Sequence, residues 1–557
     1  MNKYKWNVRN QADGLDLLER IVFGRFGESA DIDAFLRPDF KLGDPFLLPD
    51  MEKAVQRIIK AIEDKEKIVV FGDYDVDGVS ATALLWEFFR YLGIDINVHI
   101  PDRFSEGYGL RESVLNNIFV SGTTLLITVD CGIRDVDLIK KMTLKGYDII
   151  VTDHHSVGDV IPDCVAVVNP KRANNLYPEA NLAGVGVAYA LARAVLQKLG
   201  VAVDKRELFE KWHLDIVAIG TVADLMPLTG ENRVIVRYGL KTLQRTKKIG
   251  LKKMMDLTGM EPAKIDSRSI GFVLGPRLNA AGRIDKAMAA FDVLTEREEM
   301  EVNILVKNLD DYNRERRNMT DQIINDIVEN MEDHVPLAIV EADESWSRGV
   351  VGLVASRIVD KYYRPAFIAQ IEDDKIVGSV RGIEGINVVK ILDRLSDLLD
   401  HYGGHSMAGG FSLEKNKWGQ FKERLASIVE ELIDPDNLER EIMIDAVTEI
   451  RELNLNLWQK WLMMEPYGLG NEEPVLLSNN IKLVNKRIIG KTGEHLKLSF
   501  EGGGKYIDAL WWKSANWDNE LEIGGRYDVV YKIGLNEYRD RKKIEMTLLD
   551  IKKNNLL

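Results

Sequence analysis

The sequence predicts an α/β protein with a parallel-sheet domain, a long connecting helix, a second α/β domain and a C-terminal OB-like β-barrel. Three observations support this prediction. Short apolar runs alternate with helix-like stretches in the first half of the chain. Apolar residues then recur at steps of three and four over residues 296–331, and the last 120 residues alternate in short strand-like segments. At 557 residues the chain also exceeds the roughly 250–300 residues at which single cores stop growing.

The apolar runs of the first domain are predicted to be parallel strands. They cover residues 68–71, 96–100, 124–130, 147–153 and 165–170. An amphipathic stretch before them, residues 49–67, is predicted to be a helix. Because ligands of parallel α/β sheets bind beyond the carboxyl ends of the strands, we expect functional groups where these runs end.

The second half of the chain is predicted to begin with one long helix, from about 296 to 331. The TERE sequence at 295–298 has the pattern of a capping box at the start of this helix. The chain is expected to divide into 1–45 (an N-terminal segment packing on the first lobe), 46–294 (first α/β domain), 295–333 (connector helix), 334–437 (second α/β domain) and 438–557 (barrel).

Three carboxylates follow the first apolar run, in the sequence IVVFGDYDVDG, as Asp73, Asp75 and Asp77. Like charges this close repel one another unless something neutralises them. The pattern would also open an EF-hand calcium loop, but Leu84 stands where a bidentate glutamate is needed and the preceding run is β-like. An acidic cap for the helix from Val79 accounts for one aspartate and not for three. A site for Mg²⁺ or Mn²⁺ is therefore favoured.

Further candidate ligands follow other predicted strands, as Asp130, the triplet Asp153-His154-His155, and Asp224. A single aspartate after a strand is often a turn residue or a cap, and a histidine pair in a loop is often structural. Their convergence on one sheet edge favours a metal site instead. Such a set could hold two metal ions about 3.5–4 Å apart, an arrangement that catalyses phosphoryl transfer.

Hydrolysis of a phosphate ester also requires groups that hold the anion. Arg103, Arg277 and Arg381 each lie among glycine, asparagine or serine residues in loop-like contexts, and arginine binds phosphate with two donors at once. The glycine clusters at 403–404 and 409–410 predict either a close approach of the backbone to a ligand or a tight turn.

The net charge of −14, from 74 basic and 88 acidic residues, argues against a nucleic-acid binder only weakly, because binding depends on local potential. Basic clusters occur at 241–253, 313–318 and 539–543, and a solvated face is the favoured interpretation of each. The chain has two cysteines, no apolar run of the roughly 18 residues that a membrane span needs, and no signal-peptide pattern in its first ten residues. We therefore expect a cytoplasmic protein without membrane association.

The motifs GDYDVDG, Asp-His-His at 153–155 and GGHSMAGG resemble the signatures of the DHH phosphoesterase superfamily. PDRFSEGYGL, GTVADLMPL and GPRLNAAGR narrow the resemblance to the RecJ family of bacterial single-strand-specific 5′→3′ exonucleases. Each motif occurs once and in the family's order, and the resemblance covers nearly the whole chain. It implies a DHH catalytic domain, a DHH-associated substrate-binding domain and an OB-fold domain that binds nucleic acid.

The resemblance also implies roles for individual residues. The implied ligands of two Mn²⁺ or Mg²⁺ ions are Asp75, Asp77, Asp130, His154 and Asp224, with Asp73 as a further ligand. His155 is implied to contact the scissile phosphate or to support the ligands, and Phe71 stands where some relatives carry an extra histidine. The implied substrate-binding residues are Arg103, Arg277, Asn279, Ser379, Arg381, Gly404 and His405, of which Arg103, Ser379 and Arg381 match the region that recognises the 5′ end.

The implied function is the release of 5′-mononucleotides from single-stranded DNA by a monomeric enzyme of DNA repair and recombination. Single-strand-binding protein and a helicase are further expected partners, and Trp511, Trp512 and Trp517 are candidates for stacking on the strand. The alternatives are a DHH phosphodiesterase for short oligonucleotides or cyclic dinucleotides, a manganese pyrophosphatase, and an inactive DNA-binding scaffold. The length and the β-rich tail argue against the first two, and the full set of expected ligands argues against the third.

Overall fold

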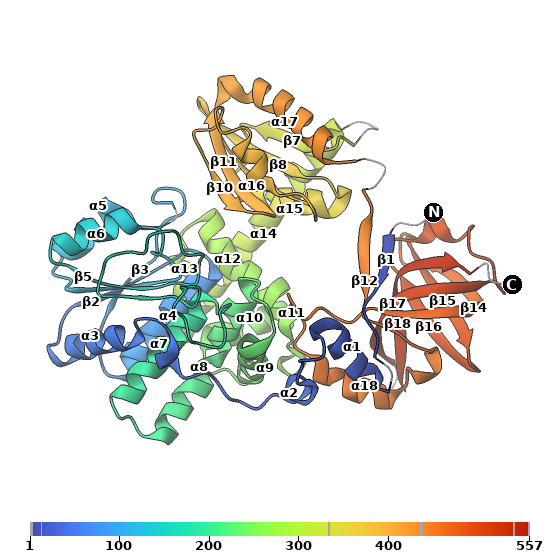
Figure 1. The fold of residues 1–557 in the computed structure, drawn as a ribbon, viewed down its shortest axis with the longest axis horizontal. Coiled ribbons are helices and arrows are strands. Elements are labelled where there is room, and N and C mark those ends of the chain that lie inside the picture. The colour runs from blue at the N-terminus through green and yellow to red at the C-terminus, as the bar shows by residue number, and fades with distance from the viewer. Residues whose placement is uncertain are drawn as a thin grey trace. The chain divides into compact units, whose positions relative to one another are not determined.

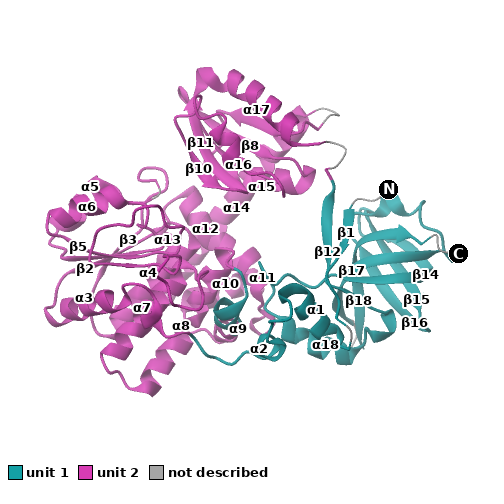
Figure 2. Cartoon of the chain, viewed as in Figure 1, with its two compact units in different colours: residues 1–42, 227–237, 439–557 teal, residues 43–226, 238–438 magenta. Residues whose placement is uncertain are grey.

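The computed structural model describes residues 4–12, 14–107, 109–331, 335–434, 438–538 and 541–554. The chain forms two compact units (Figure 2). One unit consists of residues 43–226 and 238–438, and the other consists of residues 1–42, 227–237 and 439–557. Each unit is therefore assembled from segments that are separated in the sequence. No helix of the described residues combines the length and the apolar content needed to cross a bilayer.

A five-stranded parallel sheet forms the centre of the first α/β domain (Figure 1). In the order β3-β2-β4-β5-β6, it contains β2 (Ile68–Gly72), β3 (Asn97–His99), β4 (Leu125–Val129), β5 (Asp148–Thr152) and β6 (Ala166–Val168). Each strand coincides with one of the apolar runs, so the predicted parallel sheet is confirmed. Strands β2 and β4 are buried along their whole length, as parallel strands covered on both faces are.

Helices cover both faces of this sheet. On one face, Leu115 and Phe119 of α5 (Glu112–Val120) and Ile139 and Met142 of α6 (Val136–Leu144) share a core with the strands. The other face carries α3 (Met51–Glu63), α4 (Val76–Tyr91) and α7 (Gly184–Lys198). The helices that follow are α8 (Val203–Ala223), α9 (Gly230–Leu243), α10 (Ile249–Thr258), α11 (Ser267–Ser269), a π-helix (Ile270–Leu274), α12 (Gly275–Ile284) and α13 (Met288–Thr295).

The predicted long helix is confirmed as α14 (Glu299–Asn330). Its buried residues include Val302, Leu309 and Ile323, which follow the predicted helical spacing. The predicted capping box at 295–298 is wrong, because Thr295 still belongs to α13 and its hydroxyl donates to the carbonyl of Phe291. The N-cap of α14 is Glu298, which makes no side-chain capping bond.

The second α/β domain is built on a mixed five-stranded sheet in the order β10-β11-β9-β8-β7. The strands are β7 (Ile339–Asp343), β8 (Ala366–Glu372), β9 (Lys375–Arg381), β10 (His401–His405) and β11 (Ala408–Glu414). Strands β7 and β8 pair in parallel, and the others pair antiparallel. The helices are α15 (Val351–Tyr362), α16 (Val388–Asp393) and α17 (Trp418–Leu432).

The C-terminal residues form a closed five-stranded barrel, which confirms the predicted fold class. Its strands are β14 (Leu476–Ile489), β15 (His495–Gly502), β16 (Lys505–Trp511), β17 (Arg526–Tyr538) and β18 (Arg541–Lys553). Pairing runs β14-β15-β16-β18-β17, and β17 pairs back onto β14 to close the barrel. The short strand β13 (Ala446–Val447) pairs in parallel with β14, and α18 (Leu455–Trp461) precedes the barrel.

The N-terminal segment packs with the barrel, so the prediction that it packs on the first lobe is wrong. Strand β1 (Tyr4–Val8) pairs in parallel with β12 (Arg440–Ile444). Leu18 and Ile21 of α1 (Leu17–Phe26), which is followed by α2 (Ile32–Leu36), are buried in the same core as the barrel strands. The side chain of Arg25 is almost buried and pairs with buried Asp445, with two nitrogen–oxygen distances of 2.8 Å.

Candidate metal and phosphate site

The aspartate loop links the end of β2 to the start of α4. Asp75 is the N-cap of α4, and its carboxylate accepts hydrogen bonds from the backbone of Asp77 at 2.9 Å and of Gly78 at 3.1 Å. A Cβ on Gly78 would lie 2.6 Å from the backbone nitrogen and oxygen of Asp73, so the turn requires glycine here. The GDYDVDG sequence thereby brings three carboxylates into one tight turn.

The carboxylate of Asp77 meets the N-terminus of α7, where the backbone N–H groups of Gly184 and Val185 donate to it at 2.6 and 2.9 Å. Asp130 follows β4 with a positive φ of 63°, which bulky residues rarely adopt. A Cβ on Gly184 would lie 2.5 Å from the Oδ1 atom of Asp130. Gly184 therefore allows the carboxylates of Asp77, in the first turn of α4, and Asp130, just after β4, to approach the same helix end.

His154 lies among these carboxylates. Its Nε2 atom is 3.2 Å from Oδ1 of Asp130, 3.4 Å from Oδ2 of Asp224 and 3.8 Å from Oδ2 of Asp77. Three groups of residues could each hold a metal ion, because within each group the donor atoms all lie within 4.8 Å of one another. They are Asp77 with His154 and Asp224, Asp73 with Asp75 and Asp130, and Asp130 with His154 and His155.

Several of these donor atoms are buried without a hydrogen-bond partner among the described residues. They are Oδ1 of Asp130, both ring nitrogens of His154 and Oδ2 of Asp224. A buried polar atom without a partner costs free energy, and metal coordination would satisfy the two carboxylate oxygens and one ring nitrogen of His154. The donor set of carboxylates and imidazole suits Mn²⁺ or Mg²⁺.

Burial and mutual repulsion shift the pKa values in this cluster. Burial, followed by the charge of Asp75, raises the pKa of Asp77 to about 7. Burial and the charge of Asp77 raise the pKa of Asp224 to about 9 and that of Asp130 well above its usual range. Burial lowers the pKa of His154 to about 3, so the imidazole is neutral, as a metal ligand must be. The shifts show that this many negative charges are unfavourable here without a cation.

Asp153 has a different environment from the other aspartates. Its Oδ1 atom accepts from the backbone of His154 at 2.7 Å, from the backbone of His155 at 3.0 Å and from Nδ1 of His155 at 2.8 Å. Its Oδ2 atom accepts from the backbone of Ile133 at 3.0 Å. Burial acts to raise the pKa of Asp153, but the hydrogen bonds and charge of His155 hold it below its usual value. Asp153 therefore orients His155 rather than offering a free ligand atom.

Two of the predicted substrate-binding residues have partners within the fold. Arg277 on α12 pairs with Asp310 on α14, with its Nε atom 2.9 Å from Oδ1, and also donates to the carbonyl of Val273. Asn279 accepts from the backbone of Val76 at 3.2 Å and so supports the start of α4. The guanidinium of Arg103 lies 4.5 Å from the centre of the Tyr74 ring. Tyr74 stands between Asp73 and Asp75 in the sequence.

Ser379 and Arg381 lie together on β9 of the second domain. A Cβ on Gly352, in the first turn of α15, would lie 3.3 Å from the hydroxyl of Ser379 and 3.4 Å from Nη2 of Arg381. Burial lowers the pKa of Arg381, whose guanidinium donates to the carbonyl of Val380. A half-buried guanidinium and a hydroxyl beside a helix N-terminus form a suitable anion site.

The glycines of the GGHSMAGG sequence follow from a hairpin. A Cβ on Gly404 would lie 2.3 Å from the carbonyl oxygen of Ala408 on the facing strand β11. Close pairing with the facing strand accounts for this glycine, which lies within β10 and not in the turn of the hairpin. His405, at the end of β10, is exposed.

One partly buried cation near the site is missing from the predicted residues. Arg283 at the end of α12 is partly buried, and it donates to the carbonyl of Gly349 at 3.0 Å. Burial, followed by the charges of Arg103 and Arg316, lowers its pKa to about 9. Its position in the GPRLNAAGR motif was the signal that could have identified it.

Comparison with known proteins places these features in one family. Family models match residues 67–221 ("DHH family, N-terminal domain"), 334–434 ("DHHA1 domain") and 444–550 ("RecJ OB domain"). The single-stranded-DNA-specific exonuclease RecJ of Escherichia coli (strain K12) is 32% identical over 527 residues, which cover 90% of each chain. The chain belongs to the RecJ family. The three matched regions lie inside the predicted domains, whose boundary residues stay predictions.

Other RecJ proteins support this assignment. RecJ of Bacillus subtilis (strain 168) is 36% identical over 91% of this chain, although the chain spans only 64% of that relative. The crystal structure of RecJ in complex with Mn²⁺ from Thermus thermophilus aligns with a TM-score of 0.82 and 27% identity, covering 100% of this chain and 80% of that chain. A structure of exonuclease RecJ bound to manganese is 32% identical and aligns with a TM-score of 0.61, covering 70% of this chain and 96% of that chain.

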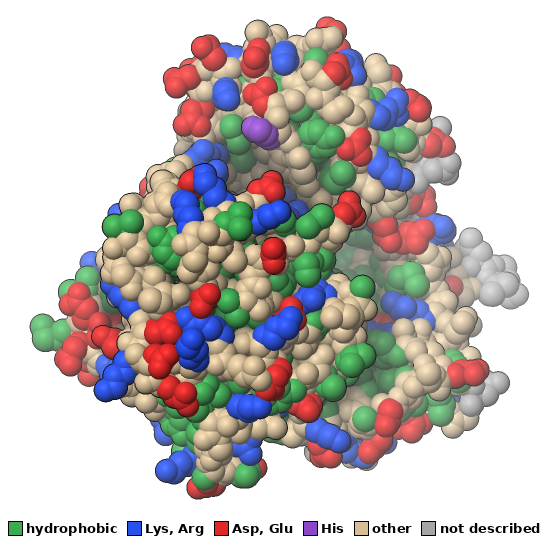
Figure 3. All heavy atoms as spheres, turned by 60° about the vertical axis from the view of Figure 1, so that its left-hand side comes forward, with side chains coloured by type: hydrophobic (Ala, Val, Ile, Leu, Met, Phe, Trp, Pro, Cys, Tyr) green, Lys and Arg blue, Asp and Glu red, His purple; other side chains and the backbone are tan. Residues whose placement is uncertain are grey.

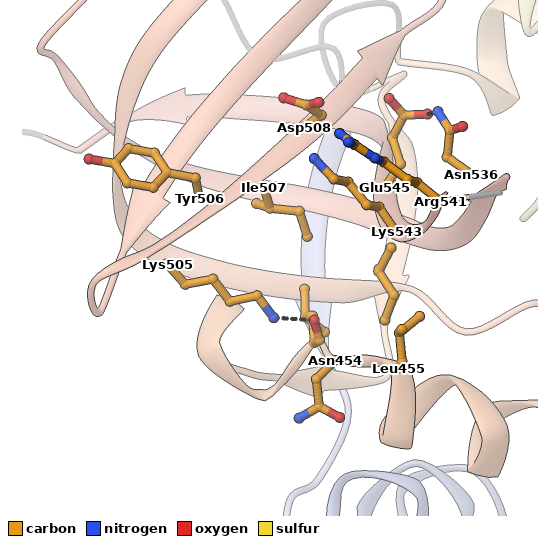
Figure 4. Close-up of a pocket in the computed structure, with 12 residues that line it drawn as sticks. Asn454, Leu455, Lys505, Tyr506, Ile507, Asp508, Asn536, Arg541, Lys543 and Glu545 are labelled. Carbon is orange, nitrogen blue, oxygen red and sulfur yellow. Dashed lines mark hydrogen bonds between the residues drawn. The ribbon is translucent and has the colours of Figure 1, made fainter. Parts of the chain in front are cut away.

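The matched RecJ OB domain carries a pocket of about 710 Å³ on the outside of the barrel. Lys505 and Ile507 of β16 and Arg541 and Lys543 of β18 help to line it, and Tyr506, which is 70% exposed, extends its ring outward (Figure 4). Cations beside an exposed aromatic ring are the elements of a single-strand binding surface.

The three tryptophans predicted to stack on the strand differ in exposure. Trp511 is buried, and Trp517 packs against the barrel core. Trp512 is 54% exposed and contacts the ring of His495 edge-on, so it alone of the three offers an open face. On the face of the molecule shown in Figure 3, acidic and basic side chains are interspersed, so the net charge of −14 does not form one acidic patch there.

Proposed function

We propose that the chain is a single-stranded-DNA-specific 5′→3′ exonuclease of DNA repair and recombination, which hydrolyses phosphodiester bonds with two metal ions and releases 5′-mononucleotides. The observation that carries this proposal is the cluster around Asp130, His154 and Asp224, in which four buried donor atoms make no hydrogen bond to the described residues. The RecJ relatives bear the name single-stranded-DNA-specific exonuclease, and solved RecJ structures contain Mn²⁺ or Mg²⁺.

The residues of the cluster suit the chemistry of this reaction. The residues that would hold two Mn²⁺ or Mg²⁺ ions are Asp73, Asp75, Asp77, Asp130, His154 and Asp224. When bound, the ions supply a hydroxide nucleophile near neutral pH and neutralise charge on the phosphoryl oxygens. His155, whose Nδ1 atom Asp153 contacts and whose pKa is raised, would hydrogen-bond a phosphoryl oxygen through its ring. Burial alone would lower the pKa of His155, but the hydrogen bond and charge of Asp153 outweigh it.

The 5′ end of the strand would be held by Arg103 from the first domain and by Ser379 and Arg381 from the second. The position of Ser379 and Arg381 beside the N-terminus of α15 supports this role. His405 and Gly404 on β10 would contact substrate phosphates, whereas Arg277 and Asn279 would act mainly by supporting α12 and α4. Single-strand-binding protein and a helicase as partners, the monomeric state and the cytoplasmic location stay predictions.

The proposal is tested with single strands labelled at the 5′ or the 3′ end, a blunt duplex, Mn²⁺ and the full chain, with Asp77→Ala as the inactive control. Immediate release of 5′-labelled mononucleotide, slow shortening of the 3′-labelled strand and an uncut duplex are expected. Degradation from the 3′ end, or of di- and trinucleotides only, would indicate a short-substrate phosphodiesterase. Strand binding without cleavage would indicate an inactive scaffold.

Mn²⁺ binding is expected to release protons and to strengthen as the pH rises from about 6 to 8. The pKa of Asp77 is raised to about 7 and that of Asp224 to about 9, so both carboxyls are partly or largely protonated at neutral pH without metal. Both must lose their protons to coordinate the ion, and lowering the pH opposes this. Calorimetric titration in two buffers with different ionisation enthalpies measures the protons released, and identical heats in both buffers would contradict the prediction.

Tyr506→Ala is expected to weaken binding of a long single strand about 5- to 150-fold, because stacking of one base contributes about 1–3 kcal/mol. Hydrolysis of a strand too short to reach the barrel should be unchanged. Fluorescence anisotropy with the catalytically inactive Asp77→Ala background measures the affinity. Trp512→Ala is the comparison variant, and a loss of affinity with Trp512→Ala alone would place the strand on the other aromatic surface.

A further inference from the structure

Arg348 of the second domain contacts the first-domain loop that carries Arg103. The backbone N–H of Arg348 donates to the side-chain oxygen of Gln370 on β8 at 3.0 Å, which anchors it to the second domain. Its guanidinium donates to the carbonyl oxygen of Phe104 in the first domain. The same guanidinium lies 5.3 Å from the centre of the Phe104 ring. The Arg348 side chain therefore contacts both the backbone and the ring of Phe104, the residue that follows Arg103.

Close backbone contact reinforces this grip. A Cβ on Gly349 would lie 2.5 Å from the carbonyl oxygen of Arg283 and 3.3 Å from the Phe104 ring. Arg283 in turn donates to the carbonyl of Gly349 at 3.0 Å. Only glycine allows the two domains to approach this closely at residue 349. The two domains are therefore tightly packed against each other at Gly349.

The gripped loop is itself well ordered by local bonds. The carboxylate of Asp102 accepts from the backbone of Phe104 at 2.8 Å and of Ser105 at 2.9 Å, which closes a turn around Arg103. The guanidinium of Arg103 then reaches the ring of Tyr74 in the aspartate loop. A shift of Phe104 would consequently move Arg103 relative to the metal cluster.

The same short segment of the second domain also touches the other half of the proposed 5′-end site. Gly352 follows Arg348 by four residues and packs against Ser379 and Arg381. Residues 348–352 thus contact the Arg103 loop at one end and the Ser379–Arg381 pair at the other. This segment therefore connects the two groups.

We propose that Arg348 is a positioning residue for 5′-end specificity, which sets the distance between Arg103 and the Ser379–Arg381 pair so that both bind one terminal phosphate. This inference rests on the proposed function and adds to it a residue that touches neither the metal cluster nor the phosphate. Displacing a phosphate-binding group by about 1 Å can cost up to about 100-fold in rate. Loss of Arg348 should therefore lower the preference for a 5′-phosphate selectively.

The test compares kcat/KM for two strands of one sequence, with a 5′-phosphate and with a 5′-hydroxyl, using the full chain and Mn²⁺. We expect the wild type to prefer the phosphate and Arg348→Ala to reduce that preference about tenfold, mainly through KM of the phosphorylated strand. Arg381→Ala should reduce it as well. Arg357→Ala is the matched control, since Arg357 lies on α15 of the same domain and pairs with Asp321.

The outcomes separate this inference from the proposed function. If the wild type does not cut single strands, the proposed function fails. If Arg348→Ala lowers kcat/KM equally for both strands while Arg381→Ala changes the ratio, Arg348 is only structural and the inference is wrong. A wild type that shows no preference for the phosphate overturns it too. Arg348→Lys keeps the charge but cannot contact both the backbone and the ring of Phe104, and it decides the question if the alanine variant does not fold. Its ratio of kcat/KM for the 5′-phosphate and 5′-hydroxyl strands is expected to be intermediate.

Discussion

Asp130→Asn is expected to lower hydrolysis more than about 1,000-fold and, at the same time, to raise the melting temperature of the metal-free protein. The activity falls because Asp130 belongs to two of the three ligand sets, and an amide is a poor ligand for Mn²⁺. The stability rises because burial and the charges of Asp77, Asp75, Asp73 and Asp224 hold the pKa of Asp130 well above its usual range. The unfolded chain therefore ionises this carboxyl at a lower pH than the folded chain does, so the folded state loses stability as the pH rises above the ordinary pKa of aspartate, and asparagine removes this loss.

Differential scanning fluorimetry with and without Mn²⁺, together with the end-labelled strand assay, measures both effects. The metal-free variant should melt at least about 2 °C above the wild type, since 1 kcal/mol shifts a domain of this size by about 2–4 °C. The stabilisation that Mn²⁺ gives the wild type should be largely lost. Asp159→Asn, at an exposed aspartate outside the cluster, is the control and should change neither quantity. A variant that melts lower than the wild type would show that Asp130 stabilises the metal-free fold, contrary to this prediction.

Arg25→Met is expected to destabilise the unit that contains the barrel by about 3–5 kcal/mol. The guanidinium forms two 2.8 Å bonds to Asp445 and further bonds to Oδ1 of Asn471 at 3.0 Å and to the carbonyl of Glu472 at 2.7 Å. The side chains of Arg25 and Asp445 are only 5% and 4% exposed. Removing the arginine therefore leaves a buried carboxylate without its main partner.

Urea unfolding followed by tryptophan fluorescence reports this effect, because Trp461 and Trp511 are buried in the same core. Arg37→Met is the matched control, since Arg37 pairs with Asp33 on the surface with exposures of 67% and 78%. The control should cost no more than about 0.5 kcal/mol. Equal losses in the two variants would mean that the buried pair contributes no more than an exposed one.

The parts of the fold that local patterns encode were predictable from the sequence. The strands β2, β4 and β5 are continuous apolar runs, and Asp73, Asp130 and Asp153 follow their ends. Parallel strands place their carboxyl ends at one edge of the sheet, so these aspartates were expected to lie near one another. The pairing of β1 with β12 was not predictable, because Tyr4 and Arg440 are joined by no local signal. The packing of α1 against the barrel was missed for the same reason.

The candidate site shows the same division between local and long-range information. The spacing of the aspartates identified the cluster, but the saturation of Asp153 by backbone N–H groups depends on how its loop folds back. Arg277 looked free to bind phosphate because Asp310, its partner, lies 33 residues further along the chain. The role proposed for Arg348 likewise depends on a contact with Phe104 across 244 residues.

The assembly of one unit from residues 1–42, 227–237 and 439–557 has a consequence for biosynthesis. Helix α1 leaves the ribosome several hundred residues before the barrel strands that cover Leu18 and Ile21. At about 5–20 residues per second, the helix must wait on the order of a minute for its partners. During that time its apolar side is exposed while the other unit can already fold. A nascent chain arrested before the barrel should therefore carry a folded catalytic centre and an uncovered N-terminal helix, which is the kind of segment that chaperones bind.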